Sequence, residues 1–542
     1  MPGSYDTNRP MSFKLRFAIT ALIAAAVFFG ACRVAEVGRH SDEWLVRHIG
    51  AEPDTLNPLT STDAYSSTIL DDVYETLVRR NPDTLELDPL LATSWEISED
   101  GMVITFHMRE DARYTDGVPV TAHDMEYCYR KIMDPKVDCP HQRNYYSDIL
   151  EVEVPDDFTI KFTYREPYFR ALELCGGLQS IPRHLFEKSA DFNNSEHNRA
   201  PVGSGPYKLK KWVTGQKIIM ERNEDYWGKK PETTRIVYKF IQQPSTALIE
   251  LKKRHLDLMG LSALQWVKQT DGARFKRAFR KERYYTPNYS YIGWNMRRPP
   301  FSDKLVRRAM TMLLDRETIL ETIRFGLGKV VSGNAFINSP YYDSDIKPWP
   351  YDPAAAKKLL DEAGWVDTDG DGIRDKDGKP FAFEFLISSG SVFADQISTI
   401  LQRELKKVGI SMEVRRLEWA TFLKLITERD FDAATLAWSL SVETDPFQLW
   451  HSSQAEAGSN FVGFVNEEAD KIIVENRRSF DMNKRVELMK RFHAILHEEQ
   501  PYTFLLCSPS LVAIHKRFDN VIIHKLGIET REWTLNRMWT EE

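Results

Sequence analysis

The chain has 542 residues, of which 42% are hydrophobic and 28% charged, and its net charge is −7 at pH 7. This length exceeds what one compact core usually takes, so two or three substantial lobes are expected. The composition excludes a fibrous or disordered protein, and an acidic balance without a long basic run gives no support to nucleic-acid binding.

The first 32 residues differ from the rest of the chain. Lys14 and Arg16 precede the apolar run FAITALIAAAVFFGAC, which ends at Cys32. A basic start followed by an apolar run too short to span a bilayer with ease is typical of an export signal. Residues 29–32 resemble the lipobox of bacterial lipoproteins. We therefore expect Cys32 to carry lipid and to tether the mature protein in the periplasm or at the cell surface; an ordinary signal peptide with an incidental cysteine is the alternative.

The next segments mix both kinds of regular structure. The stretch SSTILDDVYETLVRR (66–80) has the apolar spacing of an amphipathic helix, whereas MVITFHM (102–108) and FTIKFTY (158–164) alternate as half-buried strands do. Between them, Asp116 and Gly117 predict a turn, and Thr121 or Asp124 can cap the helix that follows.

Helical spacing returns in the second half of the chain, in LVRRAMTMLLDRETILETIRF (305–325) and across residues 467–499. Ser302 is the expected N-cap of the first of these. A further helix should begin at Asp352-Pro353 and end at Gly364, because proline favours a helix start and glycine its end. Strands and helices interleaved over the whole length predict an α/β fold.

The stretch DTDGDGIRDKDG (367–378) resembles a calcium loop in its first half. Asp367, Asp369 and Asp371 alternate, and Gly372 stands where such a loop turns sharply. The twelfth position, which should supply a bidentate glutamate, is Gly378. We interpret the stretch as a loop between a helix and a strand, and we expect no metal or other cofactor.

Four cysteines follow Cys32. Outside the cytoplasm they can form two disulfides, in any of three connectivities. Cys128 and Cys507 lie in helix-like and strand-like segments and are expected in the core. Cys139 and Cys175 lie near predicted loops, so they are the first pair to test for a disulfide.

Several motifs in the same order resemble one family. They include EPDTLNPLTSTDAYSSTILDDVYETLVRR, the long stretch from LDPLLATSW to HDMEYCYRKI, PVGSGPYKLKKW and YIGWNMRRPPFSDKLVRRAMTMLLDRETI. Together they resemble the extracellular family 5 solute-binding proteins of ABC transporters, the peptide and nickel type. The motif glycines, Gly203 and Gly205, predict a tight crossover of the chain rather than a phosphate-binding loop.

The resemblance implies a class II periplasmic-binding-protein clamp, with two lobes and a subdomain inserted in the first. Lobe I would comprise residues 42–65, 202–290 and 511–542, the inserted subdomain residues 66–201, and lobe II residues 291–510. Residues 1–32 would be the signal peptide. The implied function is to bind a peptide between the lobes and to deliver it, as a monomer, to the ABC permease subunits in the membrane. The same fold also serves metal chelates and oligosaccharides, which remain alternatives.

The resemblance also suggests which residues face the ligand. Trp419 and Trp438 match aromatic positions that wall the pocket. The inserted subdomain, the N-terminal segment and the loop after Trp438 would supply Tyr145 or Tyr146, Asp63, Ala64, Tyr65, Asn460 and Phe461.

One position departs from the family pattern. Peptide binders carry an aspartate three residues after the tryptophan that matches Trp438, and it pairs with the peptide's ammonium group; here the residue is Ser441. A serine cannot neutralise a buried ammonium group, so Glu443 or Asp445 in the same loop is expected to take that role. In some relatives, two arginines bind the carboxylate group of the peptide. In this chain Ile426 and Thr435 stand at those positions.

An exported hydrolase is a further alternative, but no nucleophile or metal motif supports an enzyme. His493 and His497 stand four residues apart in a predicted helix, which permits a metal pair. No third ligand is marked nearby, so we interpret them as part of a solvated helix face.

Overall fold

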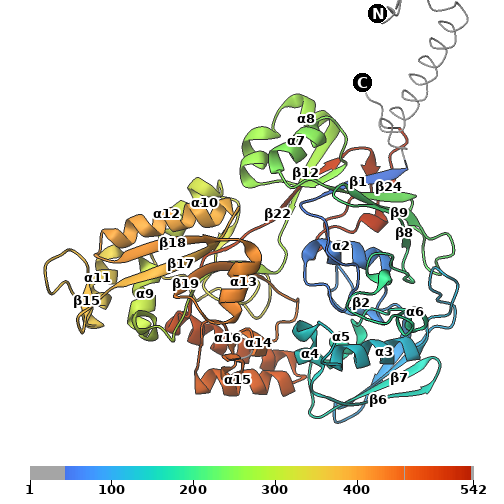
Figure 1. The fold of residues 1–542 in the computed structure, drawn as a ribbon, viewed down its shortest axis with the longest axis horizontal. Coiled ribbons are helices and arrows are strands. Elements are labelled where there is room, and N and C mark those ends of the chain that lie inside the picture. Colours follow the sequence, from blue (N-terminus) through green and yellow to red (C-terminus); the bar gives the residue numbers. More distant parts are fainter. Residues whose placement is uncertain (1–42, 457, 539–542) are drawn as a thin grey trace, which may run out of the picture.

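The computed structural model describes residues 43–456 and 458–538, so the predicted lipid attachment at Cys32 lies outside the described residues. Figure 1 shows two bodies side by side, with α7 and α8 projecting from the upper edge. No helix in the described part of the chain has both the length and the apolar character that crossing a membrane requires.

The first body contains a seven-stranded sheet. Leu45 and Val46 are successive residues of one central strand and pack into different apolar clusters, because neighbouring side chains in a strand point to opposite faces. The strands follow one another across the sheet in the order β12 (Phe279–Tyr284), β22 (Ser510–His515), β11 (Leu258–Gly260), β1 (Trp44–Ile49), β10 (Arg235–Phe240), β9 (Lys217–Arg222) and β8 (Tyr207–Val213).

A four-stranded antiparallel sheet lies in the same body, in the order β4 (Ala92–Ile97), β5 (Val103–Met108), β7 (Thr159–Tyr164) and β6 (Ile149–Asp156). Phe106 and Phe162 from this sheet belong to the same apolar cluster as Leu45 of the seven-stranded sheet. A shared core means that the inserted subdomain and lobe I pack as one unit. The helices of this body are α2 (Ala64–Val73), α3 (Ala122–Met133), α4 (Pro140–Tyr146), α5 (Ala171–Gly176), α6 (Arg183–Phe186), α7 (Pro244–Lys252) and α8 (Ala273–Ala278).

The second body is built on a five-stranded sheet, in the order β18 (Ser411–Leu417), β17 (Ala382–Ser388), β19 (Ala433–Ser439), β13 (Asn288–Trp294) and β20 (Tyr502–Phe504). Tyr291 and Ile292 of β13 again point into different clusters, so helices cover both faces. These helices are α9 (Lys304–Met312), α10 (Arg316–Ile323), α11 (Pro353–Glu362), α12 (Val392–Lys406), α13 (Trp419–Thr427), α14 (Phe447–Trp450), α15 (Glu467–Arg478) and α16 (Met482–Glu499).

The chain passes between the two bodies twice among the described residues, at 285–287 and at 508–509. The two crossings lie side by side: the Asn288 side-chain amide donates to the Ser508 backbone oxygen at 3.0 Å and accepts from the Ser508 N–H at 3.2 Å. Two short connections that lie side by side make a hinge. The two-lobed clamp predicted from the sequence is confirmed, and the residue boundaries of its lobes stay a prediction.

Several predicted helix starts and strands are confirmed. Thr121 and Asp124 form a capping box at α3, and Asp352 caps α11. At α9 the prediction is wrong by one residue: Asp303, not Ser302, accepts the Leu305 N–H at 2.8 Å. Short two-stranded pairs complete the fold: β2 (Val78–Arg80) with β3 (Leu87–Pro89), β14 (Lys329–Val330) with β21 (Leu506–Cys507), β15 (Asp375–Lys376) with β16 (Lys379–Pro380), and β23 (Phe518–Asp519) with β24 (Thr534–Leu535).

The tight crossover predicted at Gly203 and Gly205 is confirmed. A Cβ atom at Gly203 would lie 2.0 Å from the Val73 backbone oxygen, at the end of α2, and one at Gly205 would lie 2.7 Å from the same atom. Only glycine lets these two backbones approach so closely.

The proposed Cys139–Cys175 disulfide is not formed. Cys128, Cys139, Cys175 and Cys507 are all buried, free thiols. The two thiols of the proposed pair have separate partners, because Cys139 Sγ contacts the Ile132 carbonyl oxygen and Cys175 Sγ lies 3.3 Å from the Tyr164 hydroxyl. The prediction that Cys128 and Cys507 are core residues is confirmed.

Candidate functional site

A column of aromatic rings runs out of the core of lobe II to its surface. At its outer end Trp438, near the end of β19, stacks on Phe461 with ring centroids 6.1 Å apart. On its inner side Trp438 stacks on Tyr291 at 6.3 Å, and Tyr291 stacks on Tyr502 at 3.8 Å. The two tyrosines are buried, whereas Trp438 and Phe461 are half-buried. Trp438 therefore presents a rigid apolar wall held from behind by the core.

The loop after β19 carries the polar residues predicted for the site. Ser441 donates its hydroxyl to the Glu443 backbone oxygen at 2.8 Å, so Ser441 shapes the loop. The Glu443 carboxylate accepts a hydrogen bond from the Arg485 guanidinium at 2.6 Å and lies 4.0 Å from the guanidinium of Arg80 in β2. Arg80 comes from the inserted subdomain and Arg485 from α16, so Glu443 lies where the two bodies meet.

Asp445 is more completely enclosed than Glu443, with 3% of its side chain exposed. One carboxylate oxygen accepts the Phe447 N–H at 3.0 Å, and the other accepts the Tyr168 hydroxyl at 2.7 Å and lies 3.1 Å from Arg477. Burial and the Asp445 carboxylate raise the pKa of Tyr168, so the phenol keeps its proton and donates it. Asp445 is fully engaged within the protein.

A second ion cluster adjoins this loop. Glu173 of α5 binds Arg170 at 2.8 Å and Arg80 at 2.7 Å. Burial alone would raise the pKa of the Glu173 carboxyl, but the two arginines bring it below its usual value. Burial alone would likewise lower the pKa of Arg170, but Glu173 raises it overall. Glu173 and Arg170 therefore both stay charged at neutral pH.

Further contacts join the inserted subdomain to lobe II. Phe169 donates its N–H to the Arg477 backbone oxygen at 2.9 Å, and the Arg477 guanidinium binds Asp148 at 3.2 Å. The Arg485 guanidinium lies 3.7 Å from the centroid of the Phe169 ring, and Arg478 pairs with Glu166. We call these contacts the subdomain–lobe II junction. Sequence reasoning missed it, because its partners lie up to 329 residues apart and no spacing rule links them.

The predicted residues of the first body lie in two places. Tyr145 of α4 is partly buried; burial raises the pKa of its phenol, and Arg170 and Asp445 are close enough to act on it. Asp63 caps α2 by accepting the Tyr65 and Ser66 N–H groups. Ala64 is exposed, and the Tyr65 ring is 39% exposed.

Two other predicted residues are not members of the aromatic column. Trp419 begins α13, is 53% exposed and stacks on Phe422 at 5.7 Å. Asn460 is completely buried, and its amide bonds the backbone oxygens of His451 and Phe464. Asn460 therefore fixes the loop that carries Phe461.

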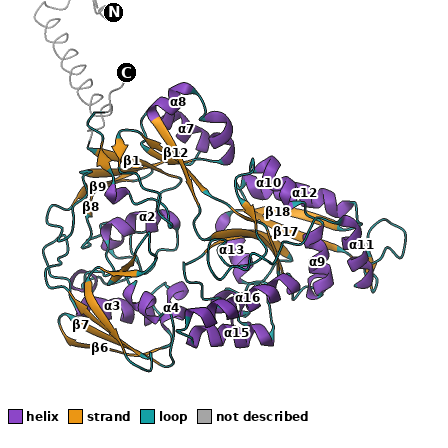
Figure 2. Cartoon of the chain, turned by 180° about the vertical axis from the view of Figure 1, so that it is seen from behind, coloured by secondary structure: helices purple, strands orange, loops and turns teal. Residues whose placement is uncertain are grey.

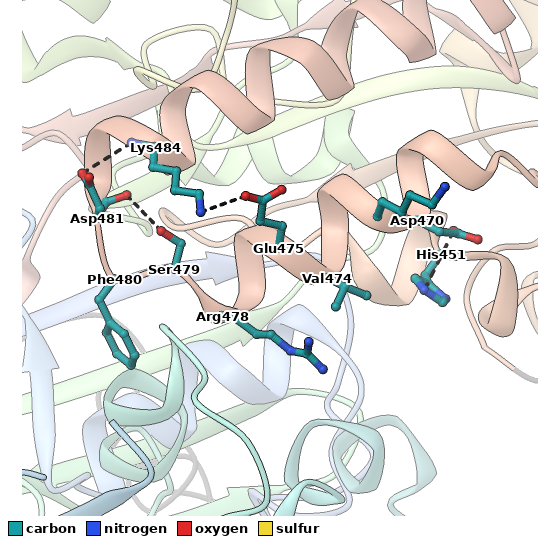
Figure 3. A pocket seen from close by; sticks show the side chains of 10 residues that line it. His451, Asp470, Val474, Glu475, Arg478, Ser479, Phe480, Asp481 and Lys484 are labelled. Carbon is teal, nitrogen blue, oxygen red and sulfur yellow. Dashed lines mark hydrogen bonds and ion pairs between the residues drawn. The ribbon is translucent and has the colours of Figure 1, made fainter. Parts of the chain in front are cut away.

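A surface hollow of about 700 Å³ lies along α15 and α16 (Figure 3). Two of its charged groups have partners: Lys484 binds Glu475 at 2.8 Å, and Arg478 pairs with Glu166 in the subdomain–lobe II junction. None of the ligand-binding residues predicted from the sequence lines it.

The histidine interpretation is wrong for His493. Its ring is completely buried, with Nε2 3.0 Å from the Ser332 hydroxyl and Nδ1 accepting the Asp343 N–H at 3.2 Å. His497 contacts the Lys347 backbone oxygen at 2.9 Å and stacks on Trp349. Both rings have structural partners.

Comparison with known proteins gives a consistent result. The model of the bacterial extracellular solute-binding proteins, family 5 (middle region), matches residues 86–460. The oligopeptide-binding protein AppA of Bacillus subtilis is 30% identical, over 93% of this chain and 95% of its own. The structure of that protein in complex with a nonapeptide covers 91% of this chain and 98% of its own, with a TM-score of 0.81 and 29% identity. NikZ of Campylobacter jejuni, in complex with Ni(L-His), covers 91% and 100%, with a TM-score of 0.79 and 26% identity.

Proposed function

This chain belongs to family 5 of the bacterial extracellular solute-binding proteins, and from this premise we propose that it is a lipid-anchored protein that binds a peptide between its lobes. It is an extracytoplasmic binding component of an ABC importer and not an enzyme. The proposed partners are the permease subunits, to which the monomeric protein delivers its solute.

The observation that carries the peptide proposal is the aromatic column beside the loop at residues 440–446. Trp438 and Phe461 offer an apolar surface, and Glu443 offers a negative charge at the edge of the subdomain–lobe II junction. A flat apolar wall next to fixed charges suits an extended chain whose side chains vary. The relatives whose names and titles refer to oligopeptides support the same solute class.

The two candidate partners for a peptide ammonium group are not equivalent. Both Asp445 oxygens accept donors from the protein itself, and the side chain is almost inaccessible. Glu443 keeps 30% of its side chain exposed, and its second carboxylate oxygen lies 4.0 Å from Arg80. We therefore assign the ammonium contact to Glu443 and a closing role to Asp445.

Calorimetry tests this assignment. A free-amine peptide and its N-acetylated form are titrated into wild type, Glu443→Gln and the control Glu413→Gln, which changes an exposed carboxylate on β18. Glu443→Gln should weaken binding of the free amine by on the order of 3 kcal/mol, the cost of leaving a buried ammonium unpaired, and should leave the acetylated form unchanged. Equal binding of both peptides to wild type would contradict the ammonium contact. If no peptide binds, the solute is a metal chelate or an oligosaccharide, and the peptide proposal is wrong.

The membrane anchor is tested separately. Replacing Cys32 by Ser should abolish incorporation of a fatty-acid analogue, because the thiol is the group that carries the lipid. Peptide binding by the purified protein should not change. Undiminished labelling of Cys32→Ser would contradict the proposed lipoprotein.

A further inference from the structure

One small part of lobe I has a charge opposite to that of the whole chain. Residues 244–284 contain ten Lys or Arg and four Asp or Glu, a net charge of +6, in a chain whose net charge is −7. This segment, which we call the α7–α8 module, includes α7, α8 and β12. Figures 1 and 2 both show its helices projecting together from the upper edge of the molecule.

The module is firmly built. Phe275 and Phe279 stack at 4.9 Å, and both belong to the apolar cluster on one face of the seven-stranded sheet. The Gln265 side chain donates to the Pro244 backbone oxygen at 2.9 Å. This bond joins the start of α7 to the helical turn at Gln265–Gln269. The helices that carry its charged side chains are therefore fixed relative to the sheet.

The two helices enclose a basic hollow of about 430 Å³. It is lined by the buried apolar residues Phe275, Ala278 and Phe279 and by the cations Lys252, Lys253, Arg254 and Arg274. Ile249, which also lines the hollow, is 52% exposed.

The nearby carboxylates pair with only some of the cations around the hollow. Glu250 lies 2.9 Å from His255 and 3.7 Å from Lys253, and Asp271 pairs with Lys276. Among the described residues, no carboxylate forms an ion pair with Lys252 or Arg274. An exposed aliphatic side chain among such cations is typical of surfaces that lie on anionic membranes.

The α7–α8 module lies close to the strand that follows the predicted lipid attachment site, and this position also favours a membrane as its partner. The described chain begins just before Trp44, which packs on the same apolar cluster as α7 and α8. Eleven residues separate Cys32 from Trp44, and they reach at most about 40 Å when extended. A lipid on Cys32 therefore holds this end of lobe I near the bilayer.

We propose that the α7–α8 module docks on the anionic phospholipid surface of the membrane to which the protein is tethered. This inference rests on the proposed lipid anchor for its geometry. The anchor would hold the module close to the bilayer, and its basic surface adds electrostatic attraction to anionic lipid. Each Lys or Arg near such a surface strengthens partitioning about fivefold.

The test uses a chain that begins at residue 33 and therefore has no lipid. All four apolar clusters lie between Trp44 and Leu535, so this chain keeps the whole described core. Co-sedimentation is measured with vesicles of mixed phosphatidylglycerol and phosphatidylcholine, and with phosphatidylcholine vesicles. The variant replaces Lys252, Lys253 and Arg274 by Gln. The control replaces three exposed lysines of lobe II, Lys357, Lys358 and Lys406, by Gln.

We expect binding to the anionic vesicles only. The module variant should bind roughly a hundredfold more weakly, the control variant should bind like the parent, and about 1 M salt should abolish binding by screening. No binding to anionic vesicles, or equal loss in both variants, would overturn the proposal. Binding to permease-containing membranes but not to pure lipid would also overturn it, in favour of an acidic protein surface. Peptide calorimetry on the same variants keeps a failure here distinct from a failure of the proposed function.

Discussion

His493 lies completely buried in α16, next to the Ser332 hydroxyl and the Asp343 backbone. Burial lowers the pKa of its imidazole to about 4, below the usual 6.5 or so. Between these two values the unfolded chain binds a proton that the folded chain does not. The contribution of neutral His493 to stability is therefore fully present above about pH 6.5 and is lost as the pH falls towards 4.

This linkage predicts a measurable loss of stability in mild acid. Between pH 7 and pH 5, His493 should lower the free energy of unfolding by about 2 kcal/mol. Urea unfolding of wild type and His493→Gln at both pH values measures it, with His255→Gln as an exposed control. The pH dependence should shrink in His493→Gln alone. An unchanged pH dependence in that variant would show that His493 does not titrate as its burial implies.

Single residues show where sequence reasoning reaches its limit. Trp438 was predicted for the site, and it lies half-buried beside the loop that carries Glu443. The Tyr168–Asp445 hydrogen bond was not predicted, because it joins residues 277 positions apart. The interpretation of His493 was wrong because helical spacing tells which residues share a face, and only packing decides whether that face is covered.

At the scale of elements, the loop at residues 367–378 has its own structural explanation. Asp367 accepts the Gly370 and Gly372 N–H groups, and Asp375 accepts the Thr368 N–H at 2.8 Å. Where a calcium loop would place its last ligand, Asp377 and Gly378 both adopt positive φ, 51° and 71°, and form the two-residue turn between β15 and β16. The carboxylates thus hold the turn themselves.

Calcium should therefore add little to stability. Carboxylate oxygens of Asp367, Asp369 and Asp375 lie within 4.8 Å of one another, so the cluster is the place to look for an ion. Thermal melts with calcium or a chelator should differ by less than about 1 °C, because tight binding to the folded state alone would raise the melting temperature with ion concentration. A rise of several degrees that Asp369→Ala removes would contradict this expectation.

The sequence predicted an element well where the residues that determine it are neighbours in the chain. The proline-start helix α11 and the capping box of α3 follow from adjacent side chains. The stretch at 66–80 was predicted as one helix, but α2 ends at Val73 and residues 78–80 form β2. β2 pairs with β3 and its Arg80 reaches the ion pairs with Glu173 and Glu443, so tertiary partners override the helical spacing.

At the scale of the whole molecule, one apolar cluster joins the inserted subdomain to lobe I, whereas lobe II has clusters of its own. The two bodies meet through the hinge at Asn288 and Ser508, through the polar subdomain–lobe II junction, and through Leu327, which packs in the apolar cluster of α7 and α8. Polar contacts exchange readily with water, so we expect the junction to open and the hinge to hold. The family motifs made the two lobes predictable, but nothing in the sequence marked the junction.

The central claim is that this protein closes on a peptide between its two bodies. Small-angle X-ray scattering tests it most directly, on protein freed of bound solute and then titrated with a peptide identified by mass spectrometry of the co-purifying material. We predict that the radius of gyration falls as the peptide saturates the protein, and falls less in Arg477→Gln, which removes the contacts with Asp445 and Asp148. A radius of gyration that stays constant through saturation, with binding confirmed by calorimetry in the same samples, would contradict the account.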